Sequence, residues 1–114
     1  MSHAMSGVMY RTFTAPIANV RIATLQALSG MNIRVDASGK QDESEFIKAT
    51  ASDREIDIEL ESISPSTTRM RSVAKKSTFM YDSATATEII QQTEKLLKPQ
   101  QKVALQQELA LRLW

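Results

Sequence analysis

Residues 46–77, FIKATASDREIDIELESISPSTTRMRSVAKKS, decide the fold of this chain. Within them, residues 55–62 alternate aliphatic with acidic or polar side chains, which is the two-residue period of a β-strand with one apolar and one wet face. Ser52, Asp53 and Pro65 interrupt the stretch with residues that favour turns. The stretch therefore predicts a meander of three antiparallel strands, at residues 46–50, 55–62 and 68–77.

The charged residues predict how these strands pair. If Leu60 lies opposite Met70, three acidic residues of one strand face three basic residues of the next on the wet side of the sheet. Each such pair contributes about 0.2–1 kcal/mol, and a one-residue slip would turn the apolar side chains outward. A two-residue turn at Ser52 and Asp53 places the first strand in the same sheet. The predicted pairs are Glu61 with Arg69, Glu59 with Arg71, Glu55 with Lys75, Ile47 with Ile58, and Lys48 with Asp57.

A helical period precedes the meander. Apolar residues recur every three or four positions and predict a helix at about residues 15–29, with Ile22 and Leu25 widening its apolar stripe. Thr14 is the expected N-cap, and Gly30 is placed where a left-handed C-cap is expected.

A second helix is predicted after the meander. Asp82 or Ser83 can cap it, and its apolar stripe of Ala86, Ile89, Ile90, Thr93, Leu96 and Leu97 ends before Pro99. Two further strands are expected at residues 8–14 and 31–36, and the second of these leads into a polar turn at residues 37–43.

The elements follow the order β-α-β-β-β-β-α, with a C-terminal helical tail. Strands bracketed by helices predict an α+β fold, a two-layer sandwich with a mainly antiparallel sheet. We expect a single domain at residues 7–98 and an amphipathic helical tail at residues 99–114. Residues 1–6 read as a cloning remnant.

Composition excludes several classes of chemistry. The chain has 114 residues, no cysteine and a net charge of +1, and its single histidine is His3. Thiolate catalysis, cysteine-based metal sites and histidine-based catalytic triads are therefore absent. We expect neither catalytic residues, nor a cofactor, nor a metal.

The densest basic run supplies the candidate anion contacts Arg69, Arg71 and Lys75. The predicted register places acidic residues beside them, which cancels most of their field, and no aromatic residue apart from Phe46 interleaves with them. We therefore expect the basic run and the acidic residues of the neighbouring strand to form a solvated sheet face, and we do not expect a nucleic-acid partner.

The tail supplies candidate partner contacts. Leu105, Leu109 and Leu113 recur every four residues, and Trp114 lies at their edge. Such a stripe docks on the chain's own core, self-associates, or binds a protein partner.

Three segments carry a family resemblance: GVMYRTFTAPIANVRIATLQALSGMNI (residues 7–33), FIKATASDREIDIELESISPSTTRMRSV (residues 46–73) and TATEIIQQTEKLL (residues 85–97). In this order of elements, residues 7–97 resemble a family of small bacterial envelope lipoproteins known as a domain of unknown function. The resemblance implies a precursor with a secretion leader and a lipid-modified cysteine, and therefore a periplasmic or outer-membrane-associated protein. It implies no activity and no catalytic residues.

We therefore expect a non-enzymatic envelope domain with a binding or structural role, in contact with a membrane only through a lipid anchor. The alternative is a cytoplasmic module that binds a small ligand or a protein in a pocket between helix and sheet.

Overall fold

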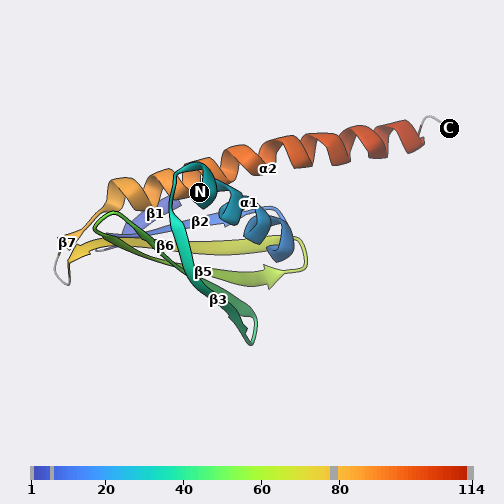
Figure 1. Ribbon diagram of the computed structural model, residues 1–114. Coiled ribbons are helices and arrows are strands. Elements are labelled where there is room, and N and C mark those ends of the chain that lie inside the picture. The colour runs from blue at the N-terminus through green and yellow to red at the C-terminus, as the bar shows by residue number, and fades with distance from the viewer. Residues whose placement is uncertain (1, 6, 78–79, 113–114) are drawn as a thin grey trace.

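The computed structural model describes residues 2–5, 7–77 and 80–112, and the side chains of residues 7–77 and 80–98. It has the predicted α+β architecture, in which an antiparallel sheet carries two helices on one face (Figure 1). The sheet order is β1-β2-β6-β5-β4-β3, and the short β7 also pairs with β6. The elements are β1 (Ser2–Met5), β2 (Val8–Phe13), α1 (Ile17–Gly30), β3 (Arg34–Gln41), β4 (Ser44–Ala51), β5 (Arg54–Ser64), β6 (Thr67–Ser77), β7 (Met80–Tyr81) and α2 (Ser83–Arg112).

The predicted register of the meander is confirmed. Leu60 lies opposite Met70, and the three acidic residues of β5 lie opposite the basic residues of β6 that the register predicted. Ile47 lies opposite Ile58, and the turn between β4 and β5 consists of the two predicted residues. The turn between β5 and β6 is shorter than expected, because both strands continue past a register shift after Ser62.

The hydrophobic core lies between the helices and the face of the sheet that they cover, here called the inner face. Four buried hydroxyl groups donate hydrogen bonds to carbonyl oxygens, which offsets the cost of burying them. Of these, Ser72 of β6 bonds the carbonyl of Ala86 on α2 at 3.1 Å. The largest fully buried apolar side chains are Val20, Leu28, Ile47, Ile56, Ile58, Leu60, Met70, Ile89 and Ile90.

Both predicted caps of α1 are wrong. Pro16 occupies the N-cap position in an extended conformation and provides no side-chain cap, so the helix begins two residues later than a Thr14 cap requires. At the other end Gly30 stays helical, and Asn32 adopts the left-handed conformation with a φ of 59°. The Ile33 amide donates to the Leu28 carbonyl at 2.9 Å, which is the long bond of a Schellman motif. Burial of both Leu28 and Ile33 fixes this later ending.

Strand β3 is longer than predicted. The expected polar turn shrinks to Asp42 and Glu43, because residues 37–41 pair with β4 after a bulge between Val35 and Ala37. Asp42 has a φ of 57°, a conformation that tight two-residue hairpin turns require. β1, within the expected cloning remnant, and β7 are strands that the sequence did not predict.

Helix α2 has the predicted start and buried stripe but a different end. Asp82 caps it, and Ala86, Ile89, Ile90, Thr93 and Leu97 are buried. The predicted end before Pro99 is wrong, because α2 continues to Arg112. A proline removes one backbone donor from a helix, and here the helix is continuous across it.

Candidate functional site

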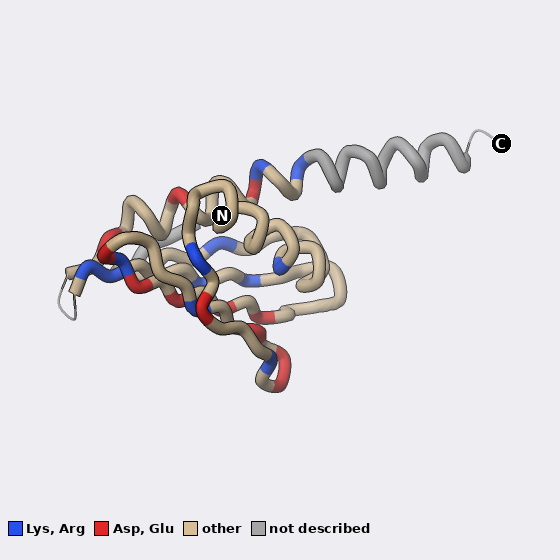
Figure 2. Tube along the Cα trace, viewed as in Figure 1, with Lys and Arg blue, Asp and Glu red and all other residues tan. Residues whose placement is uncertain are grey.

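The face of the sheet opposite the helices, here called the outer face, carries most of the sheet's charged side chains. Side chains alternate between the two faces along a strand, and directly paired residues share a face. The β5 residues paired with basic β6 residues therefore point outward, whereas Leu60 and Met70 point toward the helices. Figure 2 shows acidic and basic positions on neighbouring strands of the sheet.

The three candidate anion contacts lie together on this outer face. Arg69, Arg71 and Lys75 follow β6 at positions that share one side of the strand. Arg69 donates from Nη2 to Oε1 of Glu61 at 3.1 Å, and its guanidinium carbon lies 6.0 Å from the centre of the Tyr10 ring. Lys75 Nζ lies 5.2 Å from the centre of the Tyr81 ring. Both contacts have cation–π geometry, in which the face of each ring attracts the positive charge that lies above it.

Three aromatic rings lie on the outer face, and sequence reasoning expected only that of Phe46 beside the basic run. Tyr10 comes from β2, Phe46 from β4 and Tyr81 from β7, three segments that are distant in the sequence. Phe46 exposes 37% and Tyr81 exposes 44% of its surface. Gly39 allows the Phe46 ring to lie over β3, since a Cβ atom there would come within 2.8 Å of the ring. The expectation that no aromatic residue apart from Phe46 interleaves with the basic run is therefore wrong, because the rings of Tyr10 and Tyr81 contact it.

A hollow of about 220 Å³ opens on the outer face between Phe46 and Tyr81. Val73, a small apolar residue of β6, is buried at its base, and longer charged side chains surround it. The other residues whose side chains border the hollow are Asp57, Glu59, Arg71 and Lys75. It therefore offers apolar surface and both signs of charge within one small area.

The acidic residues of β5 form a second outward column beside the basic one. Glu61 is in an ion pair with Arg69, whereas no ion pair within 4 Å joins Glu59 to Arg71 or Glu55 to Lys75 in the part of the chain that the structure describes. Within the described part of the chain, no three or more acidic or histidine side chains are grouped so that they could hold a metal ion. Charged groups on both columns can therefore also contact a bound partner.

A second hollow, of about 250 Å³, lies on the inner side of the sheet between α1 and the β3–β4 hairpin. Leu25 forms its apolar wall, and Ile47 lies at its floor. Arg21 Nη1 donates to Oε1 of the buried Glu45 at 2.8 Å, and Lys40 lies opposite Glu45 in the strand pairing. We call this hollow the α1–hairpin groove.

One prediction for the apolar stripe of α1 is wrong. Ile22 and Leu25, expected in the apolar stripe, expose 47% and 36% of their surface. The side of α1 that carries Val20, Ala23 and Ala27 faces the core, so Leu25 borders the groove instead of entering the core.

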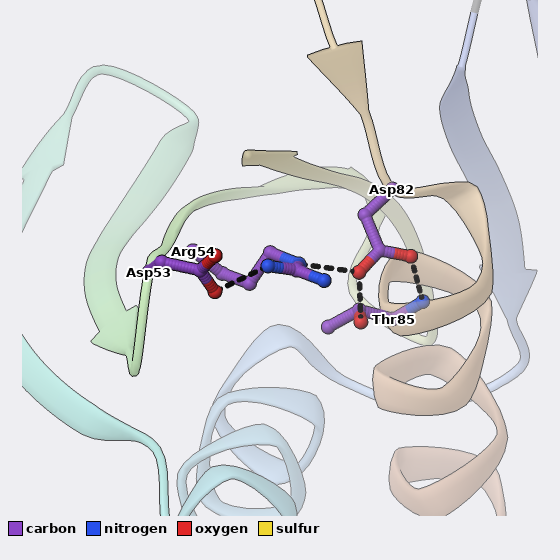
Figure 3. Close-up of polar contacts among 4 residues, drawn as sticks. All are labelled: Asp53, Arg54, Asp82 and Thr85. Atoms are coloured by element: carbon purple, nitrogen blue, oxygen red, sulfur yellow. Dashed lines mark hydrogen bonds and ion pairs between the residues drawn. The ribbon is translucent and has the colours of Figure 1, made fainter. Parts of the chain in front are cut away.

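A polar cluster ties α2 to the turn between β4 and β5 (Figure 3). Arg54 Nε donates to Oδ2 of Asp82 at 2.7 Å and also pairs with Asp53. Asp82 accepts the backbone N–H of Thr85 at 3.0 Å and its hydroxyl at 2.6 Å. The hydrogen bond from Arg54 and those from Thr85 hold the pKa of Asp82 well below its usual range. These groups bond one another, so the cluster is structural.

The remaining candidate residues, Leu105, Leu109, Leu113 and Trp114, have side chains outside the described part of the structure. No helix in the described part is both long enough and apolar enough to cross a membrane.

Comparison with known proteins identifies no relative: no protein-family model matches the chain, and no curated protein matches it.

Proposed function

We propose that this chain is a non-enzymatic binding domain that contacts a protein partner through the outer face of its sheet. The observation that carries the proposal is the presence of three aromatic rings, those of Phe46 and Tyr81 exposed and that of Tyr10 half-buried, among acidic and basic residues on a face that neither helix covers. Aromatic residues and arginine supply much of the binding energy in protein interfaces, and charge pairs supply orientation and specificity.

The mixture of charges favours a protein over a polyanion. A nucleic acid lying along Arg69 and Arg71 would also meet the acidic column about 4.8 Å away, the usual spacing of neighbouring strands. Repulsion from the carboxylates would oppose the attraction of the guanidinium groups. A protein surface can present both signs of charge and satisfy both columns.

We further propose that the domain acts in the bacterial envelope, in the periplasm or tethered to the outer membrane by a lipid. This part of the proposal rests on the resemblance carried by residues 7–97. It is tested by expressing the native gene from its own start and fractionating the cells. A lipid-modified, membrane-bound product supports the location, and an unprocessed product in the cytoplasm contradicts it.

The binding role is tested by photo-crosslinking in the native organism. A photoreactive phenylalanine analogue replaces Phe46 on the outer face and, as a matched control, Gln91 on the exposed side of α2. A discrete adduct formed from position 46 and not from position 91 supports the outer face as the binding surface. Equal labelling from both positions, or none from position 46, contradicts it.

The α1–hairpin groove favours a second candidate function, a module that binds a small ligand. Its apolar wall at Leu25 and the cation Lys40, beside the Arg21–Glu45 ion pair, fit a small organic acid with an apolar part. Carboxylates of increasing chain length should raise the melting temperature of the chain, and Lys40→Ala should abolish the rise. Lys76→Ala, at an exposed site on β6, is the control. No rise with any acid would dismiss this candidate.

A further inference from the structure

We propose that the protein partner of the outer face is a second copy of this chain, packed against it face to face. This inference rests on the function proposed above. It follows from the order of residue types across the sheet, which makes the face complementary to itself.

The strand pairing aligns outward side chains in rows that cross β4, β5, β6 and β2. The most complete row contains Phe46, Glu59, Arg71 and Tyr10, in that order. By type it reads aromatic, acid, base, aromatic. Exchanging its two ends and its two central positions therefore exchanges acid with base and keeps an aromatic ring at each end.

A two-fold axis that runs parallel to the strands, between β5 and β6, performs this exchange. It lays β5 of one copy over β6 of the other and β4 over β2, and it keeps each row opposite itself. A closed dimer with two-fold symmetry uses the same patch on both subunits, so the patch must be self-complementary. The columns of β5 and β6 meet this condition.

In the central row this packing sets Glu59 opposite Arg71 of the second copy, twice. It also sets Phe46 opposite Tyr10 of the second copy, at both ends of the row. No ion pair joins Glu59 to Arg71 of its own sheet in the described part of the chain, so the Glu59 carboxylate is available to accept charge-assisted hydrogen bonds from Arg71 of the second copy. Ring pairs at the ends of the row add apolar contact area.

Two other rows have the same symmetry of type. One contains Ser44, Glu61, Arg69 and Thr12, and therefore reads hydroxyl, acid, base, hydroxyl. The other reads Thr50, Glu55, Lys75 and Tyr81 across β4, β5, β6 and β7, again with an acid–base centre and hydroxyl-bearing ends.

The row with Lys48, Asp57 and Val73, which lies between the row of Phe46 and the row of Thr50, lacks this symmetry. It coincides with the hollow between Phe46 and Tyr81, so the packed sheets leave space there. Facing sheets pack at about −30° because each is twisted, which brings the central rows into closest contact. An interface of this kind is polar and salt-sensitive, and it forms without covering the inner face.

Charge reversal tests this arrangement with the intact chain. Glu59→Arg places two cations in each central row, and Arg71→Glu places two anions there. Each variant should dimerise at least roughly tenfold more weakly than the unmodified chain, since each repeats the like-charge contact by symmetry. An equimolar mixture of the two should restore dimers that contain one of each, because every facing pair in the mixture is opposite in charge. Sedimentation velocity and native mass spectrometry measure both results.

Three controls separate folding from association. The double variant Glu59→Arg with Arg71→Glu keeps opposite charges within the sheet and between copies, so it should dimerise like the unmodified chain. Lys95→Glu on α2 and Glu43→Arg in the β3–β4 turn reverse exposed charges away from the outer face and should leave association unchanged. If either single reversal does not fold, Glu59→Gln and Arg71→Gln take its place and should each weaken the dimer.

A chain that stays monomeric at high concentration and low ionic strength overturns the inference. So does a dimer that Glu59→Arg leaves intact, because its contact must then lie elsewhere, for instance in the tail. In either case a specific adduct from position 46 to a different protein would leave the proposed binding role standing. Absence of that adduct as well would contradict both the dimer and the proposed binding role.

Discussion

Leu60 and Met70 lie directly opposite each other at the centre of the β5–β6 pair, and neither exposes any of its surface to solvent. They face α1 and α2 from the inner face of the sheet and belong to the same hydrophobic core cluster as Leu28 and Ile89. Truncation at this pair therefore removes contacts to both layers of the sandwich.

We expect Leu60→Ala to lower the free energy of unfolding by about 2–5 kcal/mol, the range for large aliphatic side chains removed from a packed core. The adjacent outward residue supplies the control at protein concentrations low enough to keep the chain monomeric, since Glu59→Ala then removes only a solvated side chain and should change the value by about 0.5 kcal/mol or less. Urea unfolding followed by circular dichroism measures both. Equal losses at the two positions would contradict the assignment of inner and outer faces.

Alanine substitutions at Gly30 and Asn32, two positions within the Schellman motif, should change the stability of the chain in opposite directions. Gly30 lies within α1 in helical geometry with open space where a Cβ atom would be added, so Gly30→Ala should stabilise the chain by roughly 0.5–1 kcal/mol. Asn32 carries the left-handed conformation, and Asn32→Ala should destabilise the chain by roughly 1 kcal/mol. Asn32→Gly should restore stability. Thermal unfolding of the three variants checks this, and destabilisation by Gly30→Ala would indicate that the cap lies at Gly30 after all.

Asp82 gives the stability of the chain a defined pH dependence. Its pKa is lowered in the folded state, so the folded chain holds the charged form more tightly than the unfolded chain does. The resulting stabilisation is complete above the ordinary aspartate pKa of about 3.9 and is lost as the pH falls below that value toward the lowered pKa. Asp82→Asn should therefore be less stable than the unmodified chain at neutral pH, and the difference should shrink below about pH 4.

The control for this pH dependence is Asp53→Asn, on the other side of Arg54. Asp53 is exposed, and an exposed ion pair contributes about 0–1 kcal/mol. Urea unfolding at several pH values compares the two variants. A stability difference for Asp82→Asn that does not change with pH would refute a contribution from its charge.

Gly39→Ala should displace the Phe46 ring without unfolding the chain. A Cβ atom at Gly39 would meet the far end of the ring, and the exposed ring can rotate away at little cost. We expect a loss of stability of about 1 kcal/mol or less, together with weaker association through the outer face. Sedimentation velocity, as for the charge-reversal variants, measures the change in association. Unchanged association would mean that the ring does not contribute to the interface.

Local patterns accounted for the meander, because Ser52, Asp53 and Pro65 mark its turns and opposite charges select its register. The outer face needed information that no local pattern contains. Tyr10 joins the basic column only because β2 pairs with β6, and Tyr81 joins it because β7 folds back onto the same strand. Neither pairing produces a periodic signal in the sequence.

The ends of α1 illustrate a different limit. Glycine and asparagine both tolerate the left-handed conformation, so composition leaves the choice between Gly30 and Asn32 open. Burial of Ile33 against the core decides it, and that contact depends on where β3 joins the sheet. The exposed positions of Ile22 and Leu25 have a similar cause, because the orientation of α1 on the sheet selects which part of an apolar stripe is covered.

The ion pair between Arg54 and Asp82 joins two positions that are 28 residues apart in the chain. One begins β5 directly after a tight turn, and the other caps the first turn of α2. Fraying at the start of this helix must therefore break a contact that also holds the end of a hairpin. We expect the amide protons of these two regions to exchange with solvent at similar rates, as one cooperative unit, so that the beginning of α2 is as slow to open as the strands it rests on.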